Sequence, residues 1–187
     1  MIDELIDIVD KTGKPTGEKR LKSEAHALGL YHASVHIWFY TADQKVLFQK
    51  RAANKDVFPN LWDVSVAGHV GTGELPIHSA IREIEEEIGL KITEDDLEFI
   101  SIYLAKKIPK PNIIDNEFHH IYFSKLTTPV QELQLQTEEV SKVKLFEIDI
   151  LKDIIEHPKN YNNFVTHDLD YYQLIFDHVQ NRMRSKS

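Results

Sequence analysis

One stretch of this chain constrains its fold more than any other: GHVGTGELPIHSAIREIEEEIGL, residues 68–90. Pro76 suits the first turn of a helix, and Gly89 stands where a helix commonly ends in the left-handed conformation. Between them, apolar residues recur at the spacing of one helical face: Ile77, Ala80, Ile81, Ile84 and Ile88. The stretch therefore predicts a helix over 76–88 whose apolar face packs against a sheet.

The predicted helix carries its negative charge at the unfavourable end. Glu83, Glu86 and Glu87 lie at i, i+3 and i+4, where like charges cost about 0.2–0.5 kcal/mol per pair. Charges in the last turn also face the negative end of the helix dipole, at about 0.3–1 kcal/mol each. A solvated face is the ordinary interpretation of such a helix. Converging carboxylates are also ligands for Mg²⁺, which binds a few carboxylates together with substrate phosphates. We therefore expect a Mg²⁺ site, with Mn²⁺ as an alternative.

The spacing of the whole stretch resembles the Nudix box. Its fixed positions are Gly68, Glu74, Arg82, Glu83, Glu86, Glu87 and Gly89. At roughly one in fifteen per position, seven matches arise by chance in about 10⁻⁸ of starting points. The resemblance implies the Nudix α/β/α sandwich, of class α/β (α+β) with a mixed sheet. It also implies hydrolysis of a diphosphate linkage in a nucleoside diphosphate derivative or similar organic diphosphate.

The resemblance assigns roles inside the box. Glu86 and Glu87 match the metal ligands of the family, and Glu83 matches a residue that binds metal or acts as base. The carbonyl of Gly68 matches one that often completes the metal site. Arg82 and Glu74 match a pair that holds the loop against the helix, and this pairing would orient the glutamates.

A second resemblance extends over residues 26–90 and reaches DNE at 115–117. These segments resemble the type I isopentenyl-diphosphate isomerases and their Nudix hydrolase relatives. The isomerases carry a catalytic cysteine where this chain has Ala67, and the chain contains no cysteine. Isomerisation of a double bond needs a proton donor and a proton acceptor, so the substitution favours the hydrolase over the isomerase.

The isomerase resemblance also points to residues outside the box. His32, His69, Asp115 and Glu117 match metal-binding positions, whereas the spacing of His26 departs from that pattern. For each of these, a packed or solvated side chain is the alternative interpretation. Glu117 is also a candidate catalytic base, ahead of Glu138 and Glu139.

Two cations match positions that grip a diphosphate in the isomerases, namely Arg51 and Lys55. An acidic protein that binds a diphosphate needs such cations. Trp38, Phe58 and Trp62 could stack on a substrate, although core packing is the more ordinary role of an aromatic side chain.

The whole chain, residues 1–187, is predicted to form one domain. Strands are predicted at 5–10, 32–40, 45–51, 62–70, 97–107, 117–125 and 142–147. A strand and short helix form an N-terminal extension (1–30), a further helix is expected over 149–156, and a C-terminal helix covers 166–184. Along 32–40, Ala33, Val35, Ile37 and Phe39 form the predicted core face, opposite a polar face that includes His32 and His36.

Composition excludes some classes of partner. The net charge is −8 and the sequence contains no long apolar run, which argues against nucleic acid and membrane partners. We therefore expect a cytoplasmic enzyme with a small-molecule diphosphate substrate, and a homodimer is compatible with the sequence. A non-catalytic Nudix-fold binding module is a further alternative, although a pure binder would not need the complete glutamate set.

Overall fold

The computed structural model describes residues 3–184. Nine strands of this part of the chain form a mixed sheet: β1 (Leu5–Val9), β2 (Pro15–Leu21), β3 (Tyr31–Tyr40), β4 (Lys45–Arg51), β5 (Trp62–Asp63), β6 (Val66–His69), β7 (Glu98–Lys110), β8 (Ile113–Lys125) and β9 (Val140–Glu147). The helices are α1 (Lys22–Leu28), α2 (Pro76–Ile88), α3 (Asp149–Glu156) and α4 (Leu169–Arg184), with short 3₁₀ turns at Glu94–Asp96, Val130–Glu132 and Pro158–Asn160. No helix in residues 3–184 is long and apolar enough to span a membrane.

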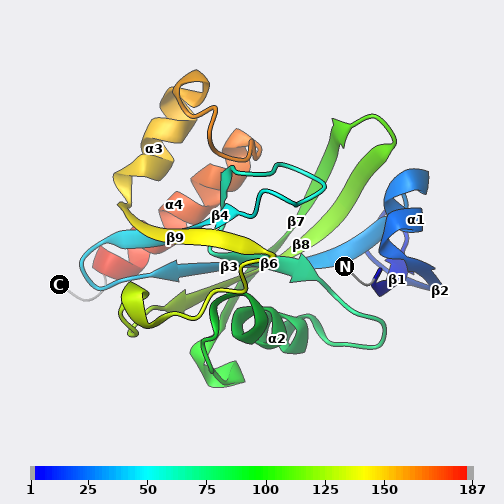
Figure 1. Cartoon of the computed structure of the whole chain (residues 1–187), viewed down its shortest axis with the longest axis horizontal. Helices are drawn as coiled ribbons and strands as arrows, with labels where there is room; N and C mark the ends of the chain where they lie inside the picture. Colours follow the sequence, from blue (N-terminus) through cyan, green and yellow to red (C-terminus); the bar gives the residue numbers. More distant parts are fainter. Residues whose placement is uncertain (1–2, 185–187) are drawn as a thin grey trace.

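Strand β3 organises the sheet. It pairs in parallel with β8 along its whole length and antiparallel with β6, β4 and β1. Strand β7 extends the sheet beyond β8, and β9 extends it beyond β4. The mixed pairing confirms the predicted fold class. Strands β1 and β2 with α1 form the N-terminal segment at one end of the molecule (Figure 1).

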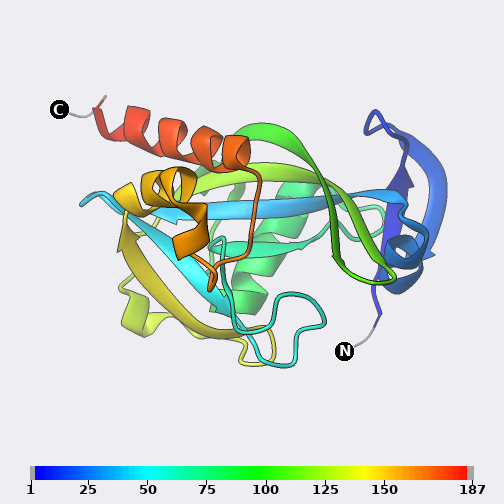
Figure 2. The ribbon, with the colours of Figure 1, turned by 90° about the horizontal axis from the view of Figure 1, so that it is seen from above.

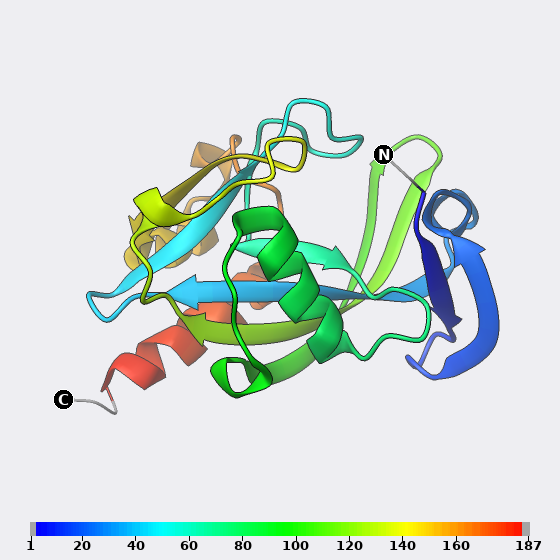
Figure 3. The ribbon, with the colours of Figure 1, turned by 60° about the horizontal axis from the view of Figure 1, so that its bottom comes forward.

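Helices cover both faces of this sheet. Helix α2 lies on one face, and α3 and α4 lie on the other (Figures 1 and 3). A core of Val35, Ile37, Phe39, Ile84 and Ile88 joins β3 to α2. A second core on the opposite face includes Trp38, Phe48, Trp62, Tyr171 and Ile175. The layers are therefore those of an α/β/α sandwich, and Figure 2 shows α4 lying along the sheet.

Helix α2 has the bounds that the sequence predicts, with Pro76 in its first turn and Gly89 at its left-handed end (φ 68°). Several predictions differ from the structure. The strand predicted at 62–70 is divided into β5 and β6, and strand β2 was not predicted. The C-terminal helix begins at Leu169 instead of at 166, because residues 165–168 form no regular structure and Val165 and His167 line the cavity described below. The polar face of β3 is buried, since both faces of the sheet are covered: His32 is 0% exposed and His36 is 6% exposed.

Candidate active site

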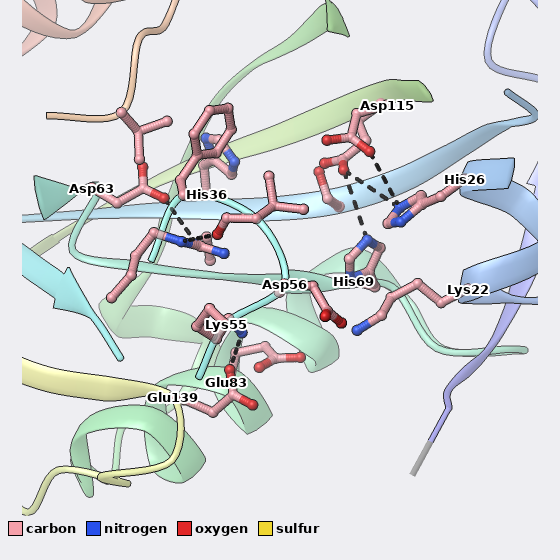
Figure 4. A pocket seen from close by; sticks show the side chains of 18 of the residues that line it. Lys22, His26, His36, Lys55, Asp56, Asp63, His69, Glu83, Asp115 and Glu139 are labelled. Atoms are coloured by element: carbon pink, nitrogen blue, oxygen red, sulfur yellow. Dashed lines mark hydrogen bonds and ion pairs between the residues drawn. The ribbon is translucent and has the colours of Figure 1, made fainter. Parts of the chain in front are cut away.

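A cavity of about 570 Å³ is lined by residues from both helical layers, including Glu83 of α2 and His167 of the segment before α4. It is lined by residues of α1, β3, β6, α2, β7 and β8, by the loop between β4 and β5, and by the segment before α4. Figure 4 shows His26, His69 and Asp115 at one end of this cavity and His36 and Asp63 at the other. The predicted site residues therefore converge on a single cavity although they come from distant parts of the chain.

The C-terminal half of α2 presents its carboxylates to this cavity. Glu83 and Glu87 are buried, with 7% and 4% exposure, whereas the Glu86 side chain is half exposed. Strand β6 passes directly over Glu83: a Cβ added to Gly68 would lie 2.0 Å from the Glu83 Cδ atom. Glycine is therefore required here by close approach, and this approach brings the Gly68 backbone next to the glutamate carboxylates.

The two buried carboxylates, Glu83 and Glu87, have perturbed pKa values. Burial raises the pKa of Glu83 to about 7, although the adjacent Arg82 guanidinium opposes this. Burial and the nearby charge of Glu83 raise the pKa of Glu87 well above its ordinary value. Gln49 and the Ala67 backbone N–H donate only weak bonds to Glu87, at 3.2 and 3.4 Å. Two buried carboxylates with so few donors fit a divalent cation, which would favour their charged forms.

Arg82 forms the pair with Glu74 that the resemblance implies. Its Nη2 lies 3.0 Å from Glu74 Oε2 and its Nε lies 3.3 Å from Glu74 Oε1. The same guanidinium donates to Glu83 at 2.7 Å, to Glu86 at 3.2 Å and to the His69 carbonyl at 3.2 Å. Arg82 thus ties the loop before α2 to strand β6 and to two of the three glutamates.

A second group of potential metal ligands lies at the end of the cavity that holds His26, His69 and Asp115. One ligand atom from each of His26, His32, His69 and Glu117 falls within 4.8 Å of all the others. Glu117 Oε1 lies 3.7 Å from the Nε2 atoms of His32 and His69 and 4.0 Å from that of His26. Asp115 lies 3.7 Å from His26. His32, His69, Asp115 and Glu117, all identified from the sequence, are therefore brought together here.

The hydrogen bonds of this group fit a cation. The His32 Nδ1–H donates to the Leu30 carbonyl at 2.9 Å, which leaves the Nε2 lone pair for a metal. His69 Nε2 and Asp115 Oδ1 are buried and have no hydrogen-bond partner in the described part of the chain. Burial and the charge of Glu117 raise the pKa of Asp115 to about 6, and burial lowers the pKa of His26 to about 4. Buried polar atoms without hydrogen-bond partners are expected where a metal ion completes a site.

His26 is a site residue that the sequence analysis did not assign. It lies on α1, and Gly29 with a left-handed φ of 64° turns the chain from α1 into β3. This turn brings His26 Nε2 to 3.3 Å from His32 Nε2. The spacing of six residues between them departs from the isomerase pattern, so their pairing depends on the turn and could not be predicted from that pattern.

The two predicted diphosphate-binding cations line the cavity but already have partners. Arg51 donates to Asp63 at 3.1 Å and to the Val57 carbonyl at 3.1 Å, and Lys55 forms an ion pair with Glu139. Among the aromatic candidates, Trp38 and Trp62 belong to the core, as their alternative interpretation stated, and only Phe58 lines the cavity.

The cavity floor adds polar residues that the sequence analysis missed. Ser34, His36, Asp63, Lys107, His119 and His167 all line it. Strand pairing accounts for three of them, since Ser34 lies opposite both His119 and His69 and His36 lies opposite Ala67. The polar face of β3 was the only signal for these residues, and it could not reveal their partners on β7 and before α4.

Comparison with known proteins agrees with this fold. The Nudix domain profile matches residues 30–167. The chain is 34% identical to Nudix hydrolase 3 of Arabidopsis thaliana over 187 residues, which cover 97% of this chain but only 24% of that protein. It is 31% identical to the isopentenyl-diphosphate Delta-isomerase of Pectobacterium atrosepticum over 143 residues, or 76% of this chain and 75% of the isomerase.

Among solved structures, DR0079 from Deinococcus radiodurans has the same fold, with a TM-score of 0.67 and 20% identity over 91% of this chain and 98% of the other. A sandwich with a complete box on α2 defines a Nudix domain, and the chain belongs to the Nudix family. Its relatives include both Nudix hydrolases and isopentenyl-diphosphate isomerases.

Proposed function

We propose that this protein is a metal-dependent hydrolase that cleaves the diphosphate linkage of an organic diphosphate, such as a nucleoside diphosphate derivative. The observation that carries this proposal is the complete glutamate set of α2 beneath Gly68, with Glu83 and Glu87 buried and Glu87 accepting only at 3.2 and 3.4 Å. A non-catalytic binding module would have no use for this arrangement. Membership of a family whose relatives include named hydrolases also supports it.

The residues have distinct proposed roles. Glu83, Glu86, Glu87 and the Gly68 carbonyl would hold Mg²⁺ or Mn²⁺, which when bound supplies neutralisation of phosphate charge and a more acidic water. Arg82 and Glu74 keep the glutamates in place. Arg51 and Lys55 would exchange part of their present contacts for diphosphate oxygens. Hydrolysis joins the water oxygen to one phosphorus, breaks the P–O–P bond and releases two phosphorylated products, and a carboxylate accepts the water proton.

The identity of that carboxylate is constrained by the surroundings of Glu117. Burial raises its pKa, but hydrogen bonds from His119 and His32 outweigh this and hold the pKa well below the ordinary range. Its Oε1 atom faces three imidazoles. These contacts favour Glu117 as a ligand of a second cation over Glu117 as a base, and leave Glu83 as the other candidate base.

Isomerisation of isopentenyl diphosphate is the second candidate function. The group of His26, His32, His69 and Glu117 favours it, because it includes the positions at which the isomerases bind metal. Against it, Ala67 replaces the cysteine that transfers a proton, and no thiol exists elsewhere in the chain. The residue opposite Ala67 in the pairing of β3 with β6 is His36.

The test is a panel of organic diphosphates assayed for phosphate release with Mg²⁺, with Mn²⁺ and with excess chelator. We expect turnover only with metal, and loss of turnover in Glu86→Gln. Isopentenyl diphosphate is incubated separately in D₂O and its products are examined by NMR. A deuterated allylic product would overturn the hydrolase assignment, and so would the absence of metal-dependent hydrolysis across the panel.

A further inference from the structure

The floor of the cavity, between the two ligand groups and α4, is polar where an isoprenoid would need an apolar surface. Its imidazoles are those of His36, His119 and His167, and the rings of His36 and His119 stack with centroids 3.8 Å apart. All three are at most 7% exposed. Buried polar groups carry a cost unless they are hydrogen-bonded, so the free ring atoms of this floor indicate what it binds.

The hydrogen bonds of His36 leave one donor free. The Trp38 indole N–H can only donate, and it donates to the Tyr171 hydroxyl at 3.0 Å. The buried Tyr171 hydroxyl then donates to His36 Nδ1 at 2.7 Å. Neutral His36 therefore carries its proton on Nε2, and this atom has no hydrogen-bond partner among residues 3–184. Burial holds the pKa of His36 well below its ordinary value, which agrees with the neutral ring.

Lys107 adds a positive charge to the same floor, on the far side of His167, whose ring centroid lies 5.6 Å from that of His36. Its ammonium donates to His167 Nδ1 at 3.1 Å, His167 Nε2–H donates to Asp63 at 2.9 Å, and Asp63 accepts from Arg51 at 3.1 Å. This chain of bonds contains two cations and a single carboxylate. No carboxylate of the described residues lies within ion-pair distance of Lys107, and it uses one of its three donors.

Most carboxylates around Lys107 have other partners. Asp63 is bonded to Arg51 and His167, Asp168 shares the Tyr103 hydroxyl with Asp170 (3.0 and 2.7 Å), and Glu117 faces its histidines. Asp115 lies opposite Lys107 in the β7–β8 pairing and has an unpartnered Oδ1, but among the described residues it forms no ion pair with the ammonium. Burial lowers the pKa of Lys107, as expected for an ammonium that lacks a direct anionic partner. An anion supplied by a ligand would provide that partner, and another polar group of the same ligand would accept from His36.

We propose that the organic part of the diphosphate substrate is hydroxylated and carries a second anionic group, and that His36 and Lys107 bind this part at the cavity floor. The proposal rests on the proposed hydrolase function and specifies its substrate class. The volume of about 570 Å³ suits a small organic molecule with its diphosphate. An apolar chain in the same place would leave the His36 donor and the Lys107 charge unpaired.

The first test compares two diphosphates that both contain five carbons. Isopentenyl diphosphate has an apolar chain, whereas 5-phosphoribosyl 1-diphosphate carries hydroxyls and a second phosphate. Affinities are measured by calorimetry with Ca²⁺, and kcat/KM is measured with Mg²⁺ by ³¹P NMR against an enzyme-free control. We expect the wild-type protein to favour the sugar compound by at least about 100-fold, because unpaired buried polar groups reject an analogue that cannot bond to them.

The second test uses Lys107→Met, with Lys106→Met as the matched control on the exposed side of β7. Loss of one charge-assisted bond, about 1.5–3 kcal/mol, corresponds to roughly 10–100-fold weaker binding of the sugar compound. Affinity for isopentenyl diphosphate should not change, and Lys106→Met should change neither. His36→Phe, with its fold checked by thermal melting, should selectively weaken binding of the sugar compound.

The outcomes separate this inference from the proposed function. A preference for isopentenyl diphosphate, or equal losses for both compounds in Lys107→Met, overturns the polar subsite even when hydrolysis is observed. Preferential binding of the sugar compound without metal-dependent hydrolysis of any diphosphate supports the subsite and overturns the hydrolase.

Discussion

The close approach of Gly68 to Glu83 makes Gly68→Ala the most direct test of the glutamate site. The new Cβ would lie 2.0 Å from Glu83 Cδ and 2.2 Å from its Oε1, whereas carbon atoms pack at about 3.5–4.0 Å. The Glu83 carboxylate must therefore move by roughly 1.5 Å or β6 must separate from α2. The substitution keeps the Gly68 carbonyl and every charge, so it changes position alone.

A misplacement of about 1 Å in a catalytic group can cost about 100-fold in rate. We expect Gly68→Ala to lower kcat/KM at least 100-fold on the best diphosphate of the panel, and to weaken Mn²⁺ binding measured by electron paramagnetic resonance. Overpacking should also lower the free energy of unfolding by about 1–3 kcal/mol, which denaturant unfolding measures.

Gly73→Ala provides a control for general loss of stability. Gly73 has a φ of 76° with no atom within 4 Å of an added Cβ, so alanine there costs about 1–2 kcal/mol in backbone strain without touching a glutamate. Gly73→Ala should therefore lose comparable stability and keep most of its activity. Equal losses of activity in the two variants, or near-wild-type activity in Gly68→Ala, would refute the reasoning.

Three further predictions concern charge. Glu87→Gln should lower kcat at least 100-fold and yet raise the melting temperature in chelator, because burial disfavours the Glu87 carboxylate, whereas exposed Glu85→Gln should do neither. A double-mutant cycle of Arg82→Ala and Glu74→Gln should show a coupling of about 0.5–1 kcal/mol in unfolding, modest because both side chains are about one-third exposed, and strict additivity would contradict their pairing. Burial lowers the pKa of His167 to about 4, so between pH about 6.5 and 4 the unfolded chain binds a proton that the folded chain does not. The free energy of unfolding should therefore fall by up to roughly 3 kcal/mol as the pH falls through this window. An unchanged slope of stability against pH in His167→Asn would exclude His167 as the cause.

Helix α2 was predictable because its determinants are local. Pro76, Gly89 and the apolar stripe lie within fifteen residues and act through backbone geometry and one packed face. The pair of Arg82 with Glu74 is local in the same sense, since one loop joins them. The spacing of the box therefore predicts both the helix and the arrangement of its charges.

The cavity floor was not predictable because its contacts depend on strand register and on the path of the chain before α4. His36 and Lys107 are 71 positions apart in the sequence, and His167, from the segment before α4, links them: its ring centroid lies 5.6 Å from that of His36 and its Nδ1 lies 3.1 Å from Lys107 Nζ. Alternation along β3 identified a polar face but not its burial. A helix that returns from the C-terminus to cover this face leaves no local signal at residues 31–40.

Burial of that polar face explains why α4 is part of the site. Along β3, His32 belongs to the group of potential metal ligands, Ser34 and His36 form part of the cavity floor, and Trp38 belongs to the core. Tyr171 of α4 closes the core against the cavity, because its hydroxyl accepts from Trp38 and donates to His36. The tautomer of His36, and hence the donor that it offers to a substrate, is therefore set by a helix that lies more than 130 residues away in the sequence. A Nudix domain with an apolar residue at this position of α4 would lack the fixed donor, so specificity at the floor depends on the C-terminal helix as well as on the box.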